Sequence, residues 1–134
     1  LPEVSRFASK VSAYPGVRAY LLEMQRALAA RNNVIMDGRD IGTVVLPHAD
    51  IKIFLTAAPE ARARRRWKEL EERGTPQPLE QVFRDIQQRD YQDTHRETAP
   101  LKQASDALLV DTTDLDFQES FQTLLRLIKE RTEA

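Results

Sequence analysis

The chain has 134 residues, a net charge of −1, 41% hydrophobic and 31% charged residues, which describes one soluble globular domain or part of one. The lack of cysteine excludes disulfides and thiolate metal sites, and the near-zero charge leaves anion binding to locally clustered arginines. No apolar run reaches membrane-spanning length and no signal-peptide pattern is present, so the cytoplasm is the expected compartment.

Two helices are predicted before residue 32. Residues 1–14 carry apolar side chains at helical spacing, and Pro15 suits the first position of a second helix. In that second helix the apolar residues recur at offsets of four, three and four: Val17, Leu21, Met24 and Leu28. This spacing predicts an amphipathic helix that packs one face on a core.

A short apolar run, Val34–Met36, stops abruptly at the charged sequence Asp37-Gly38-Arg39-Asp40. Such a run is typical of a strand buried on both faces, as in a parallel sheet. Charged residues directly after such a strand lie at its carboxyl end, where open α/β sheets bind ligands. The alternative is an ordinary strand followed by a polar turn.

Residues 51–55 predict a second, largely buried strand. Pro59 and Gly74 then mark the beginning and end of a helix. Only Ala63, Trp67 and Leu70 form an apolar stripe on it, so we expect most of this helix to be exposed.

Three arginines of this helix, Arg62, Arg65 and Arg66, fall on one face because their offsets are three and four. Arginine forks match phosphate oxygens in a bidentate way. The alternative is a solvated helix with pairs such as Arg65–Glu69 and Lys68–Glu72. Taken alone, the pattern favours that alternative.

The next predicted helix begins at Leu79, and its apolar stripe passes Ile86 into charged residues. Steps of three and four lead from Ile86 to Arg89, Asp93 and Arg96. Half-buried charges must find partners. Either Arg89 pairs with Asp93 across one helical turn, or these side chains line a pocket for an anionic ligand; the pattern leaves both open.

Residues 107–110 predict a third buried strand, and Asp116 with Glu119 predicts a capping box that begins a final amphipathic helix. Strands that alternate with helices indicate an α/β fold with a parallel sheet flanked by helices. His48 and His95 have no metal-ligand spacing, and we expect both at the surface. Several arginines at strand ends, with few candidate nucleophiles, favour phosphoryl transfer, which depends on positioning and charge stabilisation.

The sequence resembles bacterial cytidylate kinases over its whole length. The matching segments are residues 2–5, 37–45, 62–66, 89–96, 99–101 and 104–113. Their order and spacing make the resemblance specific. It implies part of a P-loop nucleoside monophosphate kinase fold, with residues 1–134 as the carboxyl-terminal part and a helical lid at about 59–88.

This family transfers the terminal phosphoryl group of ATP to CMP or dCMP, using Mg²⁺. By the resemblance, Ser9, Arg18 and Asp40 match positions that contact the cytosine ring, and Arg39 and Arg96 match arginines that hold the nucleotide phosphate. Arg89 and Asp93 match contacts to the sugar hydroxyls, Arg62, Arg65 and Arg66 fall in the lid over the ATP phosphates, and Asp37 lies where related enzymes place an acid near Mg²⁺.

The sequence departs from the family in one large feature. It contains no glycine-rich phosphate loop ending in Gly-Lys-[Ser/Thr], and the CMP-binding insertion that follows this loop is largely absent. We therefore expect this chain to be a fragment that lacks the first strand of a monomeric enzyme. We expect the fragment to be inactive alone and able to self-associate. No nucleic acid or membrane partner is expected. The alternatives are a kinase for another nucleoside monophosphate and a non-catalytic nucleotide- or nucleic-acid-binding module.

Overall fold

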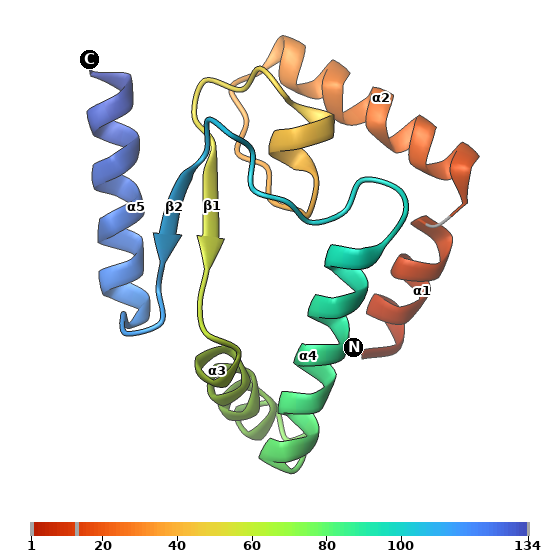
Figure 1. Cartoon of the computed structure of the whole chain (residues 1–134), viewed down its shortest axis with the longest axis vertical. Coiled ribbons are helices and arrows are strands. Elements are labelled where there is room, and N and C mark those ends of the chain that lie inside the picture. Colours follow the sequence, from red (N-terminus) through yellow and green to blue (C-terminus); the bar gives the residue numbers. More distant parts are fainter. Residues whose placement is uncertain (1, 13, 134) are drawn as a thin grey trace.

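A computed structural model describes residues 2–12 and 14–133. The elements in chain order are α1 (Pro2–Ser12), α2 (Pro15–Arg31), a π-helical turn η1 (Ile41–Val45), β1 (Ile53–Thr56), α3 (Pro59–Glu72), α4 (Leu79–His95), β2 (Leu108–Asp111) and α5 (Phe117–Thr132). Figure 1 shows α5 beside β2, and the α3–α4 hairpin beyond the carboxyl end of β1. The predicted α/β fold with a parallel sheet flanked by helices is confirmed.

The sheet consists of β1 and β2, which run parallel with Ile53 opposite Leu108. Parallel neighbours need a long crossover, and the α3–α4 hairpin supplies it. Residues paired across parallel strands share a face, so Leu55 and Leu109 lie on opposite faces. Both are more than half exposed, at 56% and 59%. Neither face of the sheet is therefore fully covered by the described part of the chain.

Residues 34–36 do not form the predicted strand, and that prediction is wrong for this structure. The segment 33–37 has no regular secondary structure, and the side chain of Ile35 is 96% exposed. A strand exists only where a neighbouring backbone accepts and donates its hydrogen bonds. Among the described residues, β1 pairs with β2 alone, and no strand lies against 34–36.

The α3–α4 hairpin has its own small core. Ala63 and Leu70 of α3 pack against Val82 of α4, and Trp67 and Phe83 add to the cluster. This confirms the predicted stripe on a mostly exposed helix. Helix α3 begins with Pro59 at its first turn and ends before Gly74, whose φ of 71° is in the left-handed region that favours glycine. The amide of Thr75 then donates to the Leu70 carbonyl at 2.9 Å, which closes the helix end.

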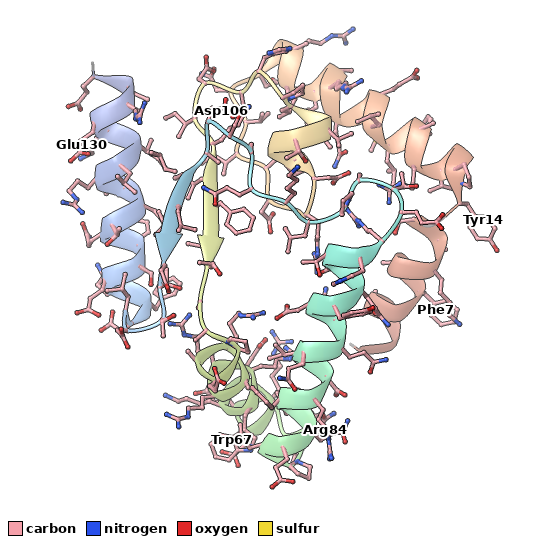
Figure 2. All side chains as sticks on the ribbon, viewed as in Figure 1. Phe7, Tyr14, Trp67, Arg84, Asp106 and Glu130 are labelled. Atoms are coloured by element: carbon pink, nitrogen blue, oxygen red, sulfur yellow. The ribbon has the colours of Figure 1, made fainter. Side chains whose placement is uncertain are left out.

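The other helices expose most of their apolar side chains. Helix α2 forms as predicted but buries no residue, so the expected packing of its apolar face on a core is not present among the described residues. Phe7 and Tyr14 project outward from α1 and the start of α2 (Figure 2). Helix α5 begins with the predicted Asp116–Glu119 capping box, but Phe117 is 86% exposed. No helix of the described segments is long and apolar enough to cross a membrane.

The solvent-accessible surface of the chain is large for its mass. The accessible surface is 10564 Å² for a chain of 15.4 kDa. A compact monomer of this mass exposes roughly 7,200 Å². The described chain therefore leaves about half as much surface again in contact with solvent as a compact domain does.

Candidate functional site

An open cleft of about 660 Å³ lies between α3, α4 and the segment at residues 37–39. Its charged lining consists of Asp37, Arg39, Arg62, Arg66, Asp85, Arg89, Asp90 and Asp93. Four arginines and four aspartates give no net formal charge. What the cleft can bind therefore depends on which guanidinium groups are already used in ion pairs.

Arg39 and Asp93 meet at one end of the cleft, although 54 residues separate them in the sequence. The Arg39 Nε donates to the Asp93 Oδ2 at 3.0 Å. Its two Nη nitrogens have no hydrogen-bond partner among the described residues. Asp93 thus orients the fork, and its outer edge stays available for a phosphate.

Asp40 lies between two arginines. Its Oδ2 is 3.4 Å from the Arg18 Nη2, and its Oδ1 is 4.0 Å from the Arg96 Nη2. Arg96 also donates from Nε to the carbonyl of Ala99 at 2.6 Å, which holds the side chain at the end of α4. Its Nη2 is buried without a hydrogen-bond partner in the described part of the chain. A buried donor of this kind is costly unless a ligand oxygen satisfies it.

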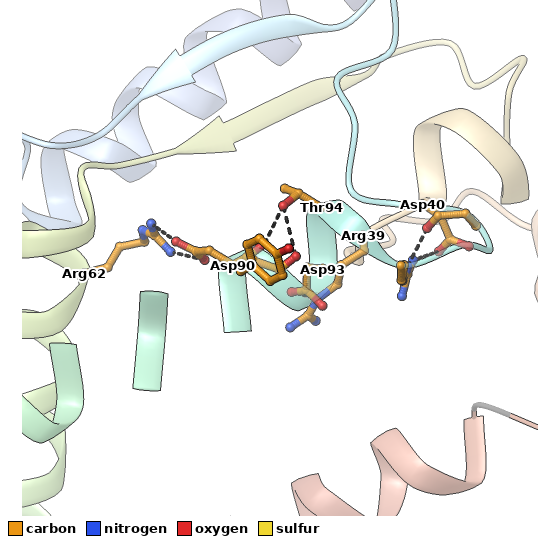
Figure 3. Close-up of polar contacts among 9 residues, drawn as sticks. Arg39, Asp40, Arg62, Asp90, Asp93 and Thr94 are labelled. Atoms are coloured by element: carbon orange, nitrogen blue, oxygen red, sulfur yellow. Dashed lines mark hydrogen bonds and ion pairs between the residues drawn. The ribbon is translucent and has the colours of Figure 1, made fainter. Parts of the chain in front are cut away.

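Arg62 and Arg65 are occupied by contacts within the chain. Arg62 donates to both carboxylate oxygens of Asp90 at 2.8 and 2.6 Å, and its Nε donates to the Ala57 carbonyl. The hydrogen bond to Asp90 raises the pKa of the Arg62 guanidinium above its ordinary value. Figure 3 shows Arg62 and Asp90 at one end of a row that ends at Asp40.

Arg65 points toward the turn between β2 and α5. It donates to the hydroxyl and the carbonyl of Thr112 and to the carbonyl of Leu115, the last at 3.0 Å. Of the three predicted lid arginines, Arg62 and Arg66 line the cleft and Arg65 does not. Arg66 pairs with Glu69 at 2.7 Å, so the ion pairs on this helix differ from the Arg65–Glu69 and Lys68–Glu72 pairs considered above.

Arg89 lines the cleft and is exposed, and it makes no hydrogen bond or ion pair to any described residue. It does not pair with Asp93, whose partner is Arg39. Of the two alternatives for this stripe of α4, the structure favours the pocket for Arg89 and Asp93, which both line the cleft, whereas Arg96 is not part of its lining. Arg89 supplies a free cation to that pocket.

Asp37 also lines the cleft, is exposed and has no described partner. Within the described part of the chain, no group of three or more histidine or acidic side chains is arranged to hold a metal. Mg²⁺ commonly uses one or two carboxylates together with substrate phosphates, so a single aspartate fits that mode. His48 and His95 are exposed, as predicted.

Ser9 lies in α1, but its side chain is outside the described part of the structure. Sequence reasoning missed two residues, Asp90 and Arg26. Asp90 follows Ile86 by four residues, so the stripe of α4 gave a signal for it. Arg26 of α2 donates to two carbonyls of η1, and no pattern in the sequence marks it.

A helical crossover between parallel strands is typical of α/β proteins, and the planar guanidinium groups that line the cleft have a geometry that matches carboxylates and phosphates. Sequence comparison gives the family. A protein-family model with the description Cytidylate kinase matches residues 1–130. The chain therefore belongs to the cytidylate kinase family.

Individual relatives agree. A cytidylate kinase of Carboxydothermus hydrogenoformans is 54% identical over 127 residues, which are 95% of this chain and 57% of that protein. A cytidylate kinase of Desulfitobacterium hafniense is 52% identical over 132 residues, 98% of this chain and 57% of the relative. A cytidylate kinase of Thermosipho melanesiensis is 48% identical over 130 residues, which are 97% of this chain and 60% of that protein. The chain thus spans less than two thirds of the length of these relatives.

Proposed function

We propose that this chain carries the acceptor-binding part of an enzyme that transfers a phosphoryl group from ATP to CMP or dCMP. The observation that carries the proposal is the unsatisfied guanidinium set around Asp40. Among the described residues the Arg96 Nη2 is buried without a hydrogen-bond partner, and the Arg39 fork uses one of its three nitrogens. A dianionic phosphate supplies the acceptor oxygens that these groups lack.

Base choice is assigned to Asp40 and Arg18. The Asp40 carboxylate can accept a hydrogen bond from the exocyclic amine of cytosine, whereas uracil presents a carbonyl oxygen at that position. Two acceptors would then face each other. Arg18, 3.4 Å from Asp40, orients the carboxylate and donates to the ring. Arg89 and Asp93, which line the cleft, would contact the sugar hydroxyls, and the base would lie beyond this lining at Arg18 and Asp40.

The donor side of the cleft would hold ATP phosphates with Mg²⁺. Asp37 is the carboxylate available to the metal shell, and the bound metal would neutralise charge on the phosphates. Arg66 would approach the same phosphates from α3. Arg62 and Arg65 would act here by holding α3 in place, since their donors are occupied.

The test is a competition. The longest natural polypeptide that contains this chain is incubated with ATP, Mg²⁺ and equal concentrations of CMP, dCMP, UMP, AMP and GMP, and diphosphates are separated by chromatography. We expect CDP and dCDP to dominate. Dominance of another diphosphate would identify a different nucleoside monophosphate kinase. No diphosphate, together with oligonucleotide binding that falls steeply with salt, would identify a nucleic-acid-binding module.

A further inference from the structure

Arg26 in the middle of α2 binds the carbonyl end of the π-helical turn η1. Its Nη2 donates to the Val44 carbonyl at 2.7 Å, and its Nε donates to the Val45 carbonyl at 3.0 Å. Carbonyls at the end of a helical turn lack intrahelical partners, and a guanidinium with two parallel donors satisfies two of them together. Val45 itself is buried, at 4% exposure, so this end of η1 is fixed in the core.

At its other end, η1 begins directly after Asp40, which is its N-cap residue. The Asp40 carbonyl accepts from the amides of Val44 at 2.8 Å and Val45 at 3.1 Å, and the Ile41 carbonyl accepts from Leu46 at 2.7 Å. The five-residue spacing of two of these bonds makes the turn π-helical, a geometry that is rare and frequently found at functional sites. Because the Asp40 backbone is bonded to residues that Arg26 holds, displacement of η1 displaces Asp40.

Helix α2 therefore holds the 40–45 segment at both ends. Arg18 contacts the Asp40 carboxylate at 3.4 Å, and Arg26, eight residues later, holds the Val44 and Val45 carbonyls at shorter distances. Eight residues of α-helix span about 12 Å. Helix α2 and η1 are in contact, so the helix acts as a rigid support for the segment.

We infer that Arg26 is a positioning residue for nucleotide selection: it fixes η1 on α2 and thereby sets where the Asp40 carboxylate stands relative to Arg18. The expected effect on base preference rests on the proposed function. The fixing of η1 on α2 by Arg26 does not. A residue that only stabilised the fold would lower stability and leave the preference among bases unchanged.

The variants are Arg26→Met, Arg26→Lys and the matched control Arg31→Met, which removes an exposed arginine from the same helix. They are made in the longest natural polypeptide that contains the chain. The first measurement is hydrogen exchange without nucleotide. We expect the amides of residues 44–46 to exchange at least tenfold faster in Arg26→Met, with the α3–α4 hairpin unchanged. Arg31→Met should match the unmodified protein.

The second measurement is the ratio of kcat/KM for CMP to that for UMP. We expect this ratio to fall roughly tenfold in Arg26→Met and to recover in part in Arg26→Lys, which can replace one of two hydrogen bonds. The KM for ATP should stay within about twofold. Unchanged exchange at 44–46, or faster exchange with an unchanged ratio, would overturn the inference. An unmodified protein that does not phosphorylate CMP would instead refute the proposed function, and the exchange result would still decide whether Arg26 positions η1.

Discussion

The ion pair between Arg62 and Asp90 should fasten the α3–α4 hairpin, and a double-mutant cycle can measure how strongly. Arg62 lies in the second turn of α3 and Asp90 in the last part of α4, so the pair joins the two helices near their ends at the sheet. The perturbations are Arg62→Ala, Asp90→Ala and both together.

The magnitude follows from geometry and exposure. Two charge-assisted hydrogen bonds of 2.6 and 2.8 Å would be strong in a dry interior. The side chains are 34% and 38% exposed, however, so water screens much of the attraction. A bidentate pair at this exposure belongs at the upper end of the surface range, and we expect a coupling free energy of about 1 kcal/mol.

The assay is urea unfolding of all variants at the same protein concentration, followed by fluorescence of Trp67, the single tryptophan of the chain, which packs against the hairpin core. A loss of about 1 kcal/mol moves the urea midpoint by roughly 0.5 M for a typical slope. Arg64→Ala removes an exposed arginine of the same helix and is the matched control, expected to have little effect. A coupling near zero, or equal loss in Arg64→Ala, would refute the fastening role.

Three further outcomes are expected. Arg39→Lys keeps the charge but loses the fork that Asp93 orients, and should lower CMP turnover by about tenfold; near-normal turnover would show that the fork is not used. Asp40→Ala should narrow the CMP-over-UMP ratio of kcat/KM, because a lost hydrogen bond of this type costs about 1–3 kcal/mol; an unchanged ratio would remove Asp40 from the base site. The hydrogen bond from Lys52 holds the pKa of Asp106 below its ordinary value, so this pair stabilises the folded state above about pH 4 and loses that effect as pH falls through the lowered pKa. Chemical denaturation across pH should therefore show Asp106→Asn less stable at neutral pH and equal to the unmodified chain in strong acid; a constant difference would contradict this.

Local signals in the sequence predicted the elements well. The start of α3 at Pro59, its end before Gly74 and the Asp116–Glu119 capping box depend on residues close in the chain, and all three are present. The strand predicted at 34–36 failed because a strand also needs a neighbour. The apolar pattern records what a segment can bury, and Ile35 finds nothing to bury against among the described residues.

For the site residues too, local patterns predicted some features and missed the contacts between distant residues. The stripe of α4 marked Asp93 and Arg96 as half-buried charges that need partners. In the structure Asp93 pairs with Arg39, and Arg96 lies 4.0 Å from Asp40. Spacing could not choose partners for long side chains that reach across the fold. Arg62 meets Asp90 at a separation of 28 residues, and Arg65 meets Thr112 at 47. These contacts depend on how α3 packs against α4 and against the end of β2, which no local pattern contains.

The last prediction concerns the 134-residue chain expressed by itself: we expect it to self-associate and to make no CDP. Its surface exceeds that of a compact monomer by roughly 3,400 Å², which is more than the roughly 1,000–2,500 Å² that each partner buries in an obligate interface. Another strand can pair at the edge of β1 that no described strand covers, and at the exposed Ile35.

The expected lack of CDP formation follows from how ATP is bound. In P-loop kinases the ATP phosphates are held by successive backbone amides of a glycine-rich loop. The four glycines at positions 16, 38, 42 and 74 are dispersed, so these 134 residues contain no such loop for the donor phosphates. Light scattering coupled to gel filtration, with a CDP assay on each fraction, tests both expectations. A monomeric fraction of the pure 134-residue chain that converts CMP to CDP would show that its arginines alone position ATP for transfer.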